Sequence, residues 1–215
     1  MTEPAVAAGP KAPRDPSGTI KRIIAAAREE FGANGFDGTK VEHIARRAGV
    51  SKQLVYLYFN GKDELYSEVL KVLTHDAYQG LLAVNLSGMS PEAAIRTYIE
   101  AVFDQFLADP VMAVVTLDQS LHGGAQIRLA PESKRMHDTL CQRLQIALDE
   151  GRGSGVFGAH VSTDSLEFMT TIIVSGCVAS RGMFARVLGR RAPEGEDPTV
   201  YRDYAVSFIL RALRA

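Results

Sequence analysis

Apolar residues in this chain recur at the spacing of amphipathic helices from residue 20 onward. The first stretch places Ile20, Ile23, Ile24, Ala27 and Phe31 on one face, and it ends at the glycine-rich segment FGANGFDG. The same spacing, with residues that favour helix ends, predicts further helices that begin near residues 39, 51, 62, 90, 110, 131, 162 and 199. Tryptophan is absent and aromatic residues are sparse. The pattern and the composition together predict an all-α protein.

Polar residues at the expected helix starts support these boundaries. Thr39 is suited to cap the second helix, and Glu42 three residues later would complete a capping box. Ser51 is suited to cap the third helix. Ser90 followed by Pro91 has the order expected of an N-cap and the first residue of a helix.

Residues 39–58, TKVEHIARRAGVSKQLVYLY, carry the residue types of a helix-turn-helix at the required positions. Ala45 is the small residue where the two helices touch. Gly49 tolerates the left-handed turn, and Val55 is the apolar residue that anchors the second helix. This spacing predicts a DNA-binding motif.

The second helix of this motif offers Lys52, Gln53 and Tyr56 to a DNA major groove. Residues 11–62 carry ten Lys and Arg against five Asp and Glu, a net charge of +5, whereas residues 63–215 carry −5. A solvated charged surface would also account for such an excess. Together with the helix-turn-helix spacing, a basic N-terminal quarter on an acidic body favours binding of a polyanion at one end.

The sequence predicts three parts. Residues 1–17 are rich in Pro and Ala and are expected to form a disordered arm. Residues 18–62 are expected to form a three-helix DNA-binding domain, and residues 63–215 a larger helical domain for effector binding and dimerisation. A hydrophobic content of 46% is sufficient for a buried core.

Two cysteines, Cys141 and Cys177, lie in helical segments, which favours reduced thiols over a disulfide framework. The N-terminal residues lack a continuous apolar region, so no signal peptide is expected. Polar residues interrupt every apolar run before it reaches the length of a membrane span. The sequence therefore predicts a soluble, cytoplasmic protein without a membrane partner.

The segment FGANGFDGTKVEHIARRAGVSKQLVYLYFNGKDELYSEVL strongly resembles the N-terminal domain of the tetracycline-repressor (TetR) family. GVSK, VYLYF and GKDEL are its most specific parts. The resemblance implies a double-stranded DNA operator as partner, with recognition-helix contacts in the major groove and flanking contacts to the phosphate backbone. The implied DNA-binding residues are Thr39, Lys52, Gln53, Tyr56, Tyr58 and Lys62.

Two positions depart from the family pattern. Gly61 stands where Ser often precedes the lysine of the fourth helix, and Leu54 stands where small or polar residues are common. The resemblance further implies a homodimer on a pseudo-palindromic operator and release of the DNA when a small, mostly apolar effector binds. Repression of transcription is the expected output.

The larger domain offers candidates for an effector pocket and for a dimer interface. Apolar and polar residues on its helices are expected to line the pocket, although the same stripe is also typical of plain core: Tyr98, Val102, Phe103, Phe106, Met112, Thr116, Gln119, Ser120, His122, Met136, Leu140, Leu144, Phe168, Met169 and Ile172. Small and aromatic residues on the last two helices are expected to form the interface of a four-helix bundle: Ser175, Gly176, Ala179, Tyr204 and Phe208.

No metal site, cofactor or enzymatic activity is expected. The five histidines form no HxxxH or HxxH pair, and the two cysteines form no CxxC pair. His75-Asp76 and the pair Asp118 and His122 have acid–base spacing, but no nucleophile elbow or cofactor loop accompanies them. The alternative function is a small-molecule-binding protein or enzyme whose helix-turn-helix is only structural.

Overall fold

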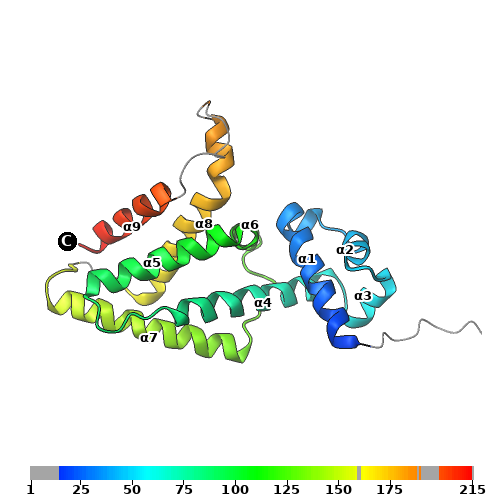
Figure 1. The fold of residues 1–215 in the computed structure, drawn as a ribbon, viewed down its shortest axis with the longest axis horizontal. Coiled ribbons are helices and arrows are strands. Elements are labelled where there is room, and N and C mark those ends of the chain that lie inside the picture. Colours follow the sequence, from blue (N-terminus) through cyan, green and yellow to red (C-terminus); the bar gives the residue numbers. More distant parts are fainter. Residues whose placement is uncertain (1–14, 159–160, 188, 190–198, 215) are drawn as a thin grey trace, which may run out of the picture.

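The computed structural model describes residues 15–158, 161–187, 189 and 199–214, and all regular structure within them is α-helical (Figure 1). The N-terminal helices are α1 (Pro16–Gly38), α2 (Val41–Ala48) and α3 (Lys52–Tyr58), followed by α4 (Lys62–Ala83). The remaining helices are α5 (Pro91–Ala108), α6 (Pro110–Leu121), α7 (Pro131–Gly153), α8 (Thr163–Val187) and α9 (Thr199–Leu213). The prediction of an all-α protein is confirmed.

Helix α1 begins earlier than the sequence analysis expected. Asp15 is its N-cap, and one carboxylate oxygen accepts a hydrogen bond from the backbone N–H of Gly18 at 2.9 Å. Pro16 and Ser17 therefore belong to the helix, and their assignment to a disordered arm was wrong. Residues 1–14 lie outside the described residues, so the expectation of an arm there remains a prediction.

The last turn of α1 and its link to α2 are organised around Gly35 and Thr39. Gly35 has a φ of 67°, which breaks the regular helix. The Thr39 side chain is buried, and its hydroxyl donates to the carbonyl oxygens of Glu30 at 3.0 Å and Gly35 at 2.7 Å. The N-cap of α2 is Lys40, without a side-chain capping bond. The predicted capping box was wrong because the Thr39 hydroxyl closes the preceding helix instead.

The predicted turn of the helix-turn-helix is confirmed. Gly49 has the left-handed angles φ 67° and ψ 38°, and it ends α2. The Ser51 hydroxyl accepts from the backbone N–H of Leu54 at 3.2 Å, as an N-cap of α3 should. Ala45 and Val55 are both buried between the helices. The local sequence therefore fixes the angle at which α3 leaves α2.

Buried apolar residues form two clusters. The smaller one joins α1, α2 and α3, and it continues into α4 through Leu65, Tyr66 and Val69 and into α6 through Val115. The larger one joins α5, α7, α8 and α9. The boundary predicted at residue 62 therefore crosses continuous packing, since the small core extends well into α4.

Figure 1 shows α1, α2 and α3 gathered at one end of the molecule. Helix α4 leads from this end into the body and packs along α7, while α6 packs against α1. The C-terminal part of α8 projects beyond the other helices. Among the described helices, only α8 is long and apolar enough to cross a membrane, and 28% of its most apolar window is buried within the protein.

Candidate functional site

Helix α3 presents a polar outer face above an apolar inner face. Val55 and the following Phe59 are buried in the small core. Lys52 and Gln53 are exposed, and Tyr56 is 47% exposed. The helix therefore places the three predicted major-groove residues on one solvent-facing surface, at one end of an elongated molecule.

Lys52 is paired with a neighbouring acid on this surface. Its ammonium group forms a solvent-exposed ion pair with the Glu42 carboxylate, and it lies 5.7 Å from the centre of the Tyr56 ring. The hydrogen bond between the two raises the pKa of Lys52 and lowers that of Glu42. Because exposed ion pairs contribute little stability, a DNA phosphate can replace Glu42 as the partner of Lys52 at small cost.

The three residues predicted to contact the DNA backbone, Thr39, Tyr58 and Lys62, have different environments. Lys62 donates from Nζ to the carbonyl oxygens of Phe36 at 3.0 Å and Thr39 at 3.4 Å, and its Nζ lies 4.3 Å from the centre of the Phe36 ring. The ammonium group thus anchors the end of α1 and keeps a third donor. Tyr58 is half-buried against the small core. The Thr39 side chain is buried and its hydroxyl already donates inside the protein, so it is not free to donate to a phosphate.

A cavity of about 420 Å³ lies in the body between α4, α5, α6 and α8. Nine of the fifteen residues predicted to line a pocket do line it: Tyr98, Val102, Phe106, Met112, Thr116, Gln119, Ser120, Phe168 and Ile172. Its walls are mainly apolar.

Six predicted residues lie elsewhere. Phe103, Leu140 and Leu144 are buried in the larger apolar cluster, because the inner faces of α5 and α7 pack on each other. The other three are absent from the cavity wall: Met169, which is 47% exposed; Met136, which is half-buried on α7; and His122, which bonds to Asp37. The helical spacing of apolar residues does not distinguish those that pack in the core from those that line the cavity.

One wall of the cavity was missed by the sequence analysis. Helix α4 contributes Leu70, Leu73, Thr74, Ala77, Tyr78 and Leu81. None of the residues predicted to line the pocket lies on α4. The polar residues Gln105 and Glu167 also line the cavity and were not expected there.

Gln119 is the most informative polar group of the cavity. The residue is only 4% exposed, and its Nε2 donates to Oε1 of Gln126 at 3.3 Å. Its own Oε1 is buried and has no hydrogen-bond partner among the described residues. Since buried acceptors are nearly always satisfied, this oxygen is unused hydrogen-bonding capacity in a residue that lines the cavity.

The residue before Gln119 connects α6 to the helix-turn-helix unit. One oxygen of the Asp118 carboxylate accepts from the backbone N–H of Phe36 at 3.2 Å, and the other accepts from the Tyr66 hydroxyl at 2.7 Å. Burial, together with Asp118, raises the pKa of Tyr66, so this hydroxyl keeps its proton. The cavity wall and the DNA-facing unit therefore share one short segment of α6.

His122 extends this connection at the end of α6. Its Nδ1 lies 2.8 Å from the backbone oxygen of Asp118, and its Nε2 lies 3.3 Å from the Asp37 carboxylate. These hydrogen bonds raise the pKa of His122. His122 was predicted to line the pocket, but it joins the body to the C-terminal end of α1 through Asp37.

Comparison with known proteins agrees with this arrangement. Residues 23–69 match bacterial regulatory proteins of the tetR family, and residues 91–209, more than half of the chain, match the tetracyclin repressor-like C-terminal domain. The chain belongs to the TetR family. It is a TetR-family transcriptional regulator with an N-terminal DNA-binding unit and a helical C-terminal domain, and the predicted family is confirmed.

Individual relatives cover different parts of this TetR-family chain. The HTH-type transcriptional repressor NicS of Pseudomonas putida is 24% identical over 65% of the chain and 66% of its own length. The HTH-type transcriptional regulator RutR of Escherichia coli is 39% identical over 46% of each protein. The chain thus spans about two thirds and about half of these two curated relatives.

A solved structure covers nearly the whole TetR-family chain. The transcriptional regulator SCO4942 of Streptomyces coelicolor, described as putative, is 25% identical and superposes with a TM-score of 0.62. The superposition covers 90% of this chain and 97% of that one. The full arrangement of DNA-binding unit and body is therefore shared with a solved regulator.

The TetR-family body exposes a broad apolar surface on α8 and α9. Tyr204 is 72% and Phe208 63% exposed, and Gly176 has open space where a Cβ atom would stand. Ser175 differs from the other predicted interface residues, because it is fully buried and its hydroxyl donates to the Ile172 carbonyl at 3.4 Å. Placing Ser175 in a dimer interface was wrong, since it faces the core of its own chain.

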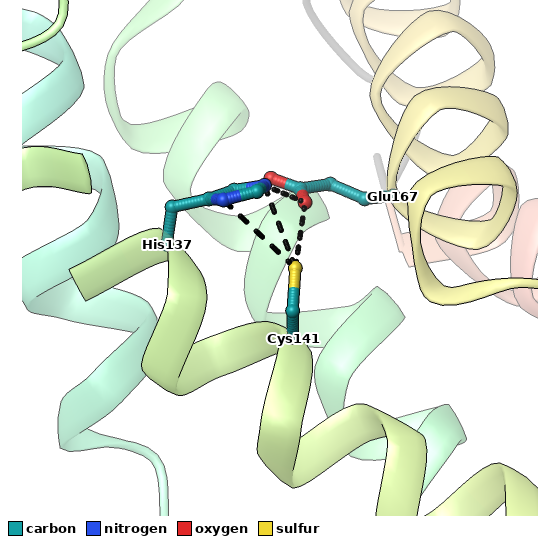
Figure 2. Close-up of side chains that lie close together, drawn as sticks. All are labelled: His137, Cys141 and Glu167. Atoms are coloured by element: carbon teal, nitrogen blue, oxygen red, sulfur yellow. Dashed lines mark hydrogen bonds and ion pairs between the residues drawn. The ribbon is translucent and has the colours of Figure 1, made fainter. Parts of the chain in front are cut away.

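A cluster of metal-ligand types lies between α7 and α8 (Figure 2). His137 Nε2 lies 2.9 Å from Oε2 of Glu167, and the Cys141 sulfur lies 3.4 Å from the same nitrogen and 3.7 Å from the same oxygen. Burial, with Glu167 and Asp164 nearby, raises the pKa of the Cys141 thiol to about 11. The cluster was not predicted, because its three ligand types are mixed and form neither a His–His nor a Cys–Cys pair along the sequence.

Proposed function

We propose that this TetR-family regulator is a homodimeric repressor that binds a pseudo-palindromic operator and is released by a small, mostly apolar molecule. One observation carries the proposal. Two consecutive residues of α6 have different partners, because Gln119 lines the cavity and Asp118 bonds to the DNA-binding unit. A molecule that moves α6 therefore acts directly on the unit that carries α3.

Operator recognition is assigned to the exposed face of α3. The Gln53 amide is suited to bidentate hydrogen bonding with adenine, and Lys52 is suited to a phosphate or a guanine. Tyr56 lies beside Lys52 on the same face. Lys62 and Tyr58 would contact the backbone at the rim. Two copies of α3 in successive major grooves require half-sites about 34–36 Å apart.

The effector is expected to be an apolar molecule with at least one hydrogen-bond donor. The mainly apolar walls favour hydrophobic contact over binding of a sugar or a phosphate. The unpartnered Oε1 of Gln119 would accept an N–H or O–H of the effector. Binding that shifts α6 would weaken the Asp118 contacts and change the spacing of the two recognition helices.

Dimerisation is assigned to the apolar surface of α8 and α9. Exposed aromatic residues such as Tyr204 and Phe208 contribute large apolar area when a second copy covers them. Light scattering on wild-type protein should give twice the chain mass, and Phe208→Asp should give a monomer. Ile146→Asp is the matched control, because Ile146 is 60% exposed but lies on α7. Equal masses for all three proteins would contradict this assignment.

Repression is the proposed output, and the relative NicS is named a repressor. The direct test is selection of fragments of the source genome by the purified protein at roughly 150 mM salt, which suppresses non-specific binding. Enrichment of a few pseudo-palindromes, followed by their release by an apolar compound, supports the proposal. A folded dimer that enriches nothing would leave the helix-turn-helix as a structural element of a ligand-binding protein.

A further inference from the structure

We propose that His137, Cys141 and Glu167 bind one zinc-like divalent transition-metal ion between α7 and α8. Figure 2 shows the three side chains converging, with His137 and Cys141 one turn apart on α7 and Glu167 reaching them from α8. Imidazole nitrogen, thiolate sulfur and carboxylate oxygen are the three ligand types that zinc takes from proteins. This site stands on its own geometry and does not rest on the proposed DNA-binding function.

The separations between the ligand atoms already fit a tetrahedral ion. With typical zinc–ligand bonds of 2.0–2.3 Å, the ligand atoms of a tetrahedron lie about 3.3–3.6 Å apart. The three observed separations are 2.9 Å, 3.4 Å and 3.7 Å. Only the nitrogen and the oxygen need to move apart, by about 0.4 Å, when an ion replaces their direct contact. Neither helix has to shift.

The surroundings orient the ligands as the outer shell of a metal site does. The Tyr78 hydroxyl donates to Oε1 of Glu167 at 3.0 Å, which leaves Oε2 for the ion. On the imidazole, Nδ1 lies 3.5 Å from the carboxylate of Asp138, so Nε2 is the nitrogen available as a ligand. A histidine that donates to a carboxylate on its far side is the usual arrangement in zinc proteins.

Binding is balanced by loss of one proton from the Cys141 thiol to solvent, since a coordinating thiol is deprotonated by the ion. The ion would then tie α7 to α8 by three bonds, one of them to a residue that also lines the cavity. Three protein ligands leave a fourth position for water or for an atom of a second ligand.

The test is titration of the full-length protein with cobalt(II), a spectroscopic substitute for zinc. The wild type should bind one ion per chain and show an intense thiolate-to-cobalt charge-transfer band. Cys141→Ser should abolish the band. Cys177→Ser is the matched control, because Cys177 is the other cysteine and lies on α8 outside the cluster, so the band should persist.

Two further variants and one measurement on the wild type complete the test. Glu167→Gln should weaken binding at least tenfold, and Tyr78→Phe should weaken it about 10- to 100-fold, as removal of an outer-shell partner does. X-ray absorption of the zinc-loaded wild type should show one sulfur and at least one imidazole. Absence of the charge-transfer band, equal bands in Cys141→Ser and Cys177→Ser, or a zinc shell without sulfur would overturn the proposal.

Discussion

The DNA-binding unit, α1 to α3, and the body, α5 to α9, differ in how they treat buried polar atoms. In the unit, the Thr39 hydroxyl donates to two carbonyl oxygens of α1. Lys62 of α4 donates to the carbonyl oxygens of Phe36 and Thr39 at the end of the same helix. In the body, four buried side-chain atoms lack a partner among the described residues: Gln119 Oε1, Ser133 Oγ, Thr170 Oγ1 and Arg202 Nε. Among the described residues, the buried side-chain polar atoms of the unit all have hydrogen-bond partners, whereas four of those in the body do not.

The link between the two regions should give the largest effect. Asp118→Ala removes the acceptor of the Phe36 N–H and the buried Tyr66 hydroxyl. It should lower the free energy of unfolding by about 2–5 kcal/mol, because two donors lose their partner. Urea denaturation measures this loss. Asp104→Ala, which breaks only an exposed pair with Arg202, should cost at most about 1 kcal/mol. Equal losses would mean that Asp118 is an ordinary surface residue.

Lys62 should affect both stability and DNA affinity. Lys62→Ala should lower the free energy of unfolding by about 1.5–3 kcal/mol, because the Phe36 and Thr39 carbonyls lose a charged donor. It should also weaken binding to all DNA sequences and reduce the salt slope by about one. Lys52→Ala should change DNA binding alone, since its partner Glu42 is exposed. Anisotropy titrations at several salt concentrations, with urea denaturation, separate the two outcomes.

A substitution of Gln119 tests whether an unpartnered polar atom of the body takes part in effector binding. Gln119→Leu removes the unpartnered acceptor together with the hydrogen bond that Nε2 donates to Gln126, so it should lower the free energy of unfolding by about 0.5–1.5 kcal/mol. It should also lower the affinity for an effector found by thermal-shift screening roughly tenfold, which corresponds to the loss of one hydrogen bond of about 1.4 kcal/mol. Gln105→Leu is the matched control, because it also removes one hydrogen bond donated by a cavity-lining amide, here to the Ala77 carbonyl, but removes no unpartnered buried acceptor. An effector that binds Gln119→Leu with unchanged affinity would remove Gln119 from the recognition of that effector.

His122 should give the smallest effect, a pH dependence of stability. Its pKa is raised in the folded protein by the Asp118 carbonyl and the Asp37 carboxylate. The protonated form therefore stabilises the fold fully below the unfolded pKa of about 6.5, and the contribution disappears as pH rises through the higher folded pKa. Thermal melts of His122→Gln should show a flatter pH profile above pH 6.5 than the wild type. A wild-type profile that is already flat there would contradict this role.

The same contrast explains what the sequence could predict. The Gly49 turn, the Ser51 cap and the outward face of α3 depend on residues a few positions apart, so the sequence determined them locally. The prediction that Thr39 caps α2 was wrong because its hydroxyl instead donates to the carbonyl oxygens of Glu30 and Gly35 in the preceding helix.

The cavity and the His137 cluster depend on long-range packing. Phe103 and Phe106 are both apolar residues of α5, but Phe103 packs in the core and Phe106 lines the cavity. The positions of α4, α6 and α8 around α5 decide which residues line the cavity. Likewise, His137 and Cys141 share one helix, but Glu167 joins them only because α8 packs beside α7. Spacing along the sequence does not contain this information.

The most direct test of the account is the affinity of the wild type and of Gln53→Ala for an operator selected from the genome. Gln142→Ala is the control, since Gln142 is an exposed glutamine on α7. The account predicts that Gln53→Ala lowers discrimination between the operator and a copy with one changed base pair by about 1–3 kcal/mol. Gln142→Ala should behave as the wild type. Identical discrimination by all three proteins would contradict recognition of DNA by the exposed face of α3.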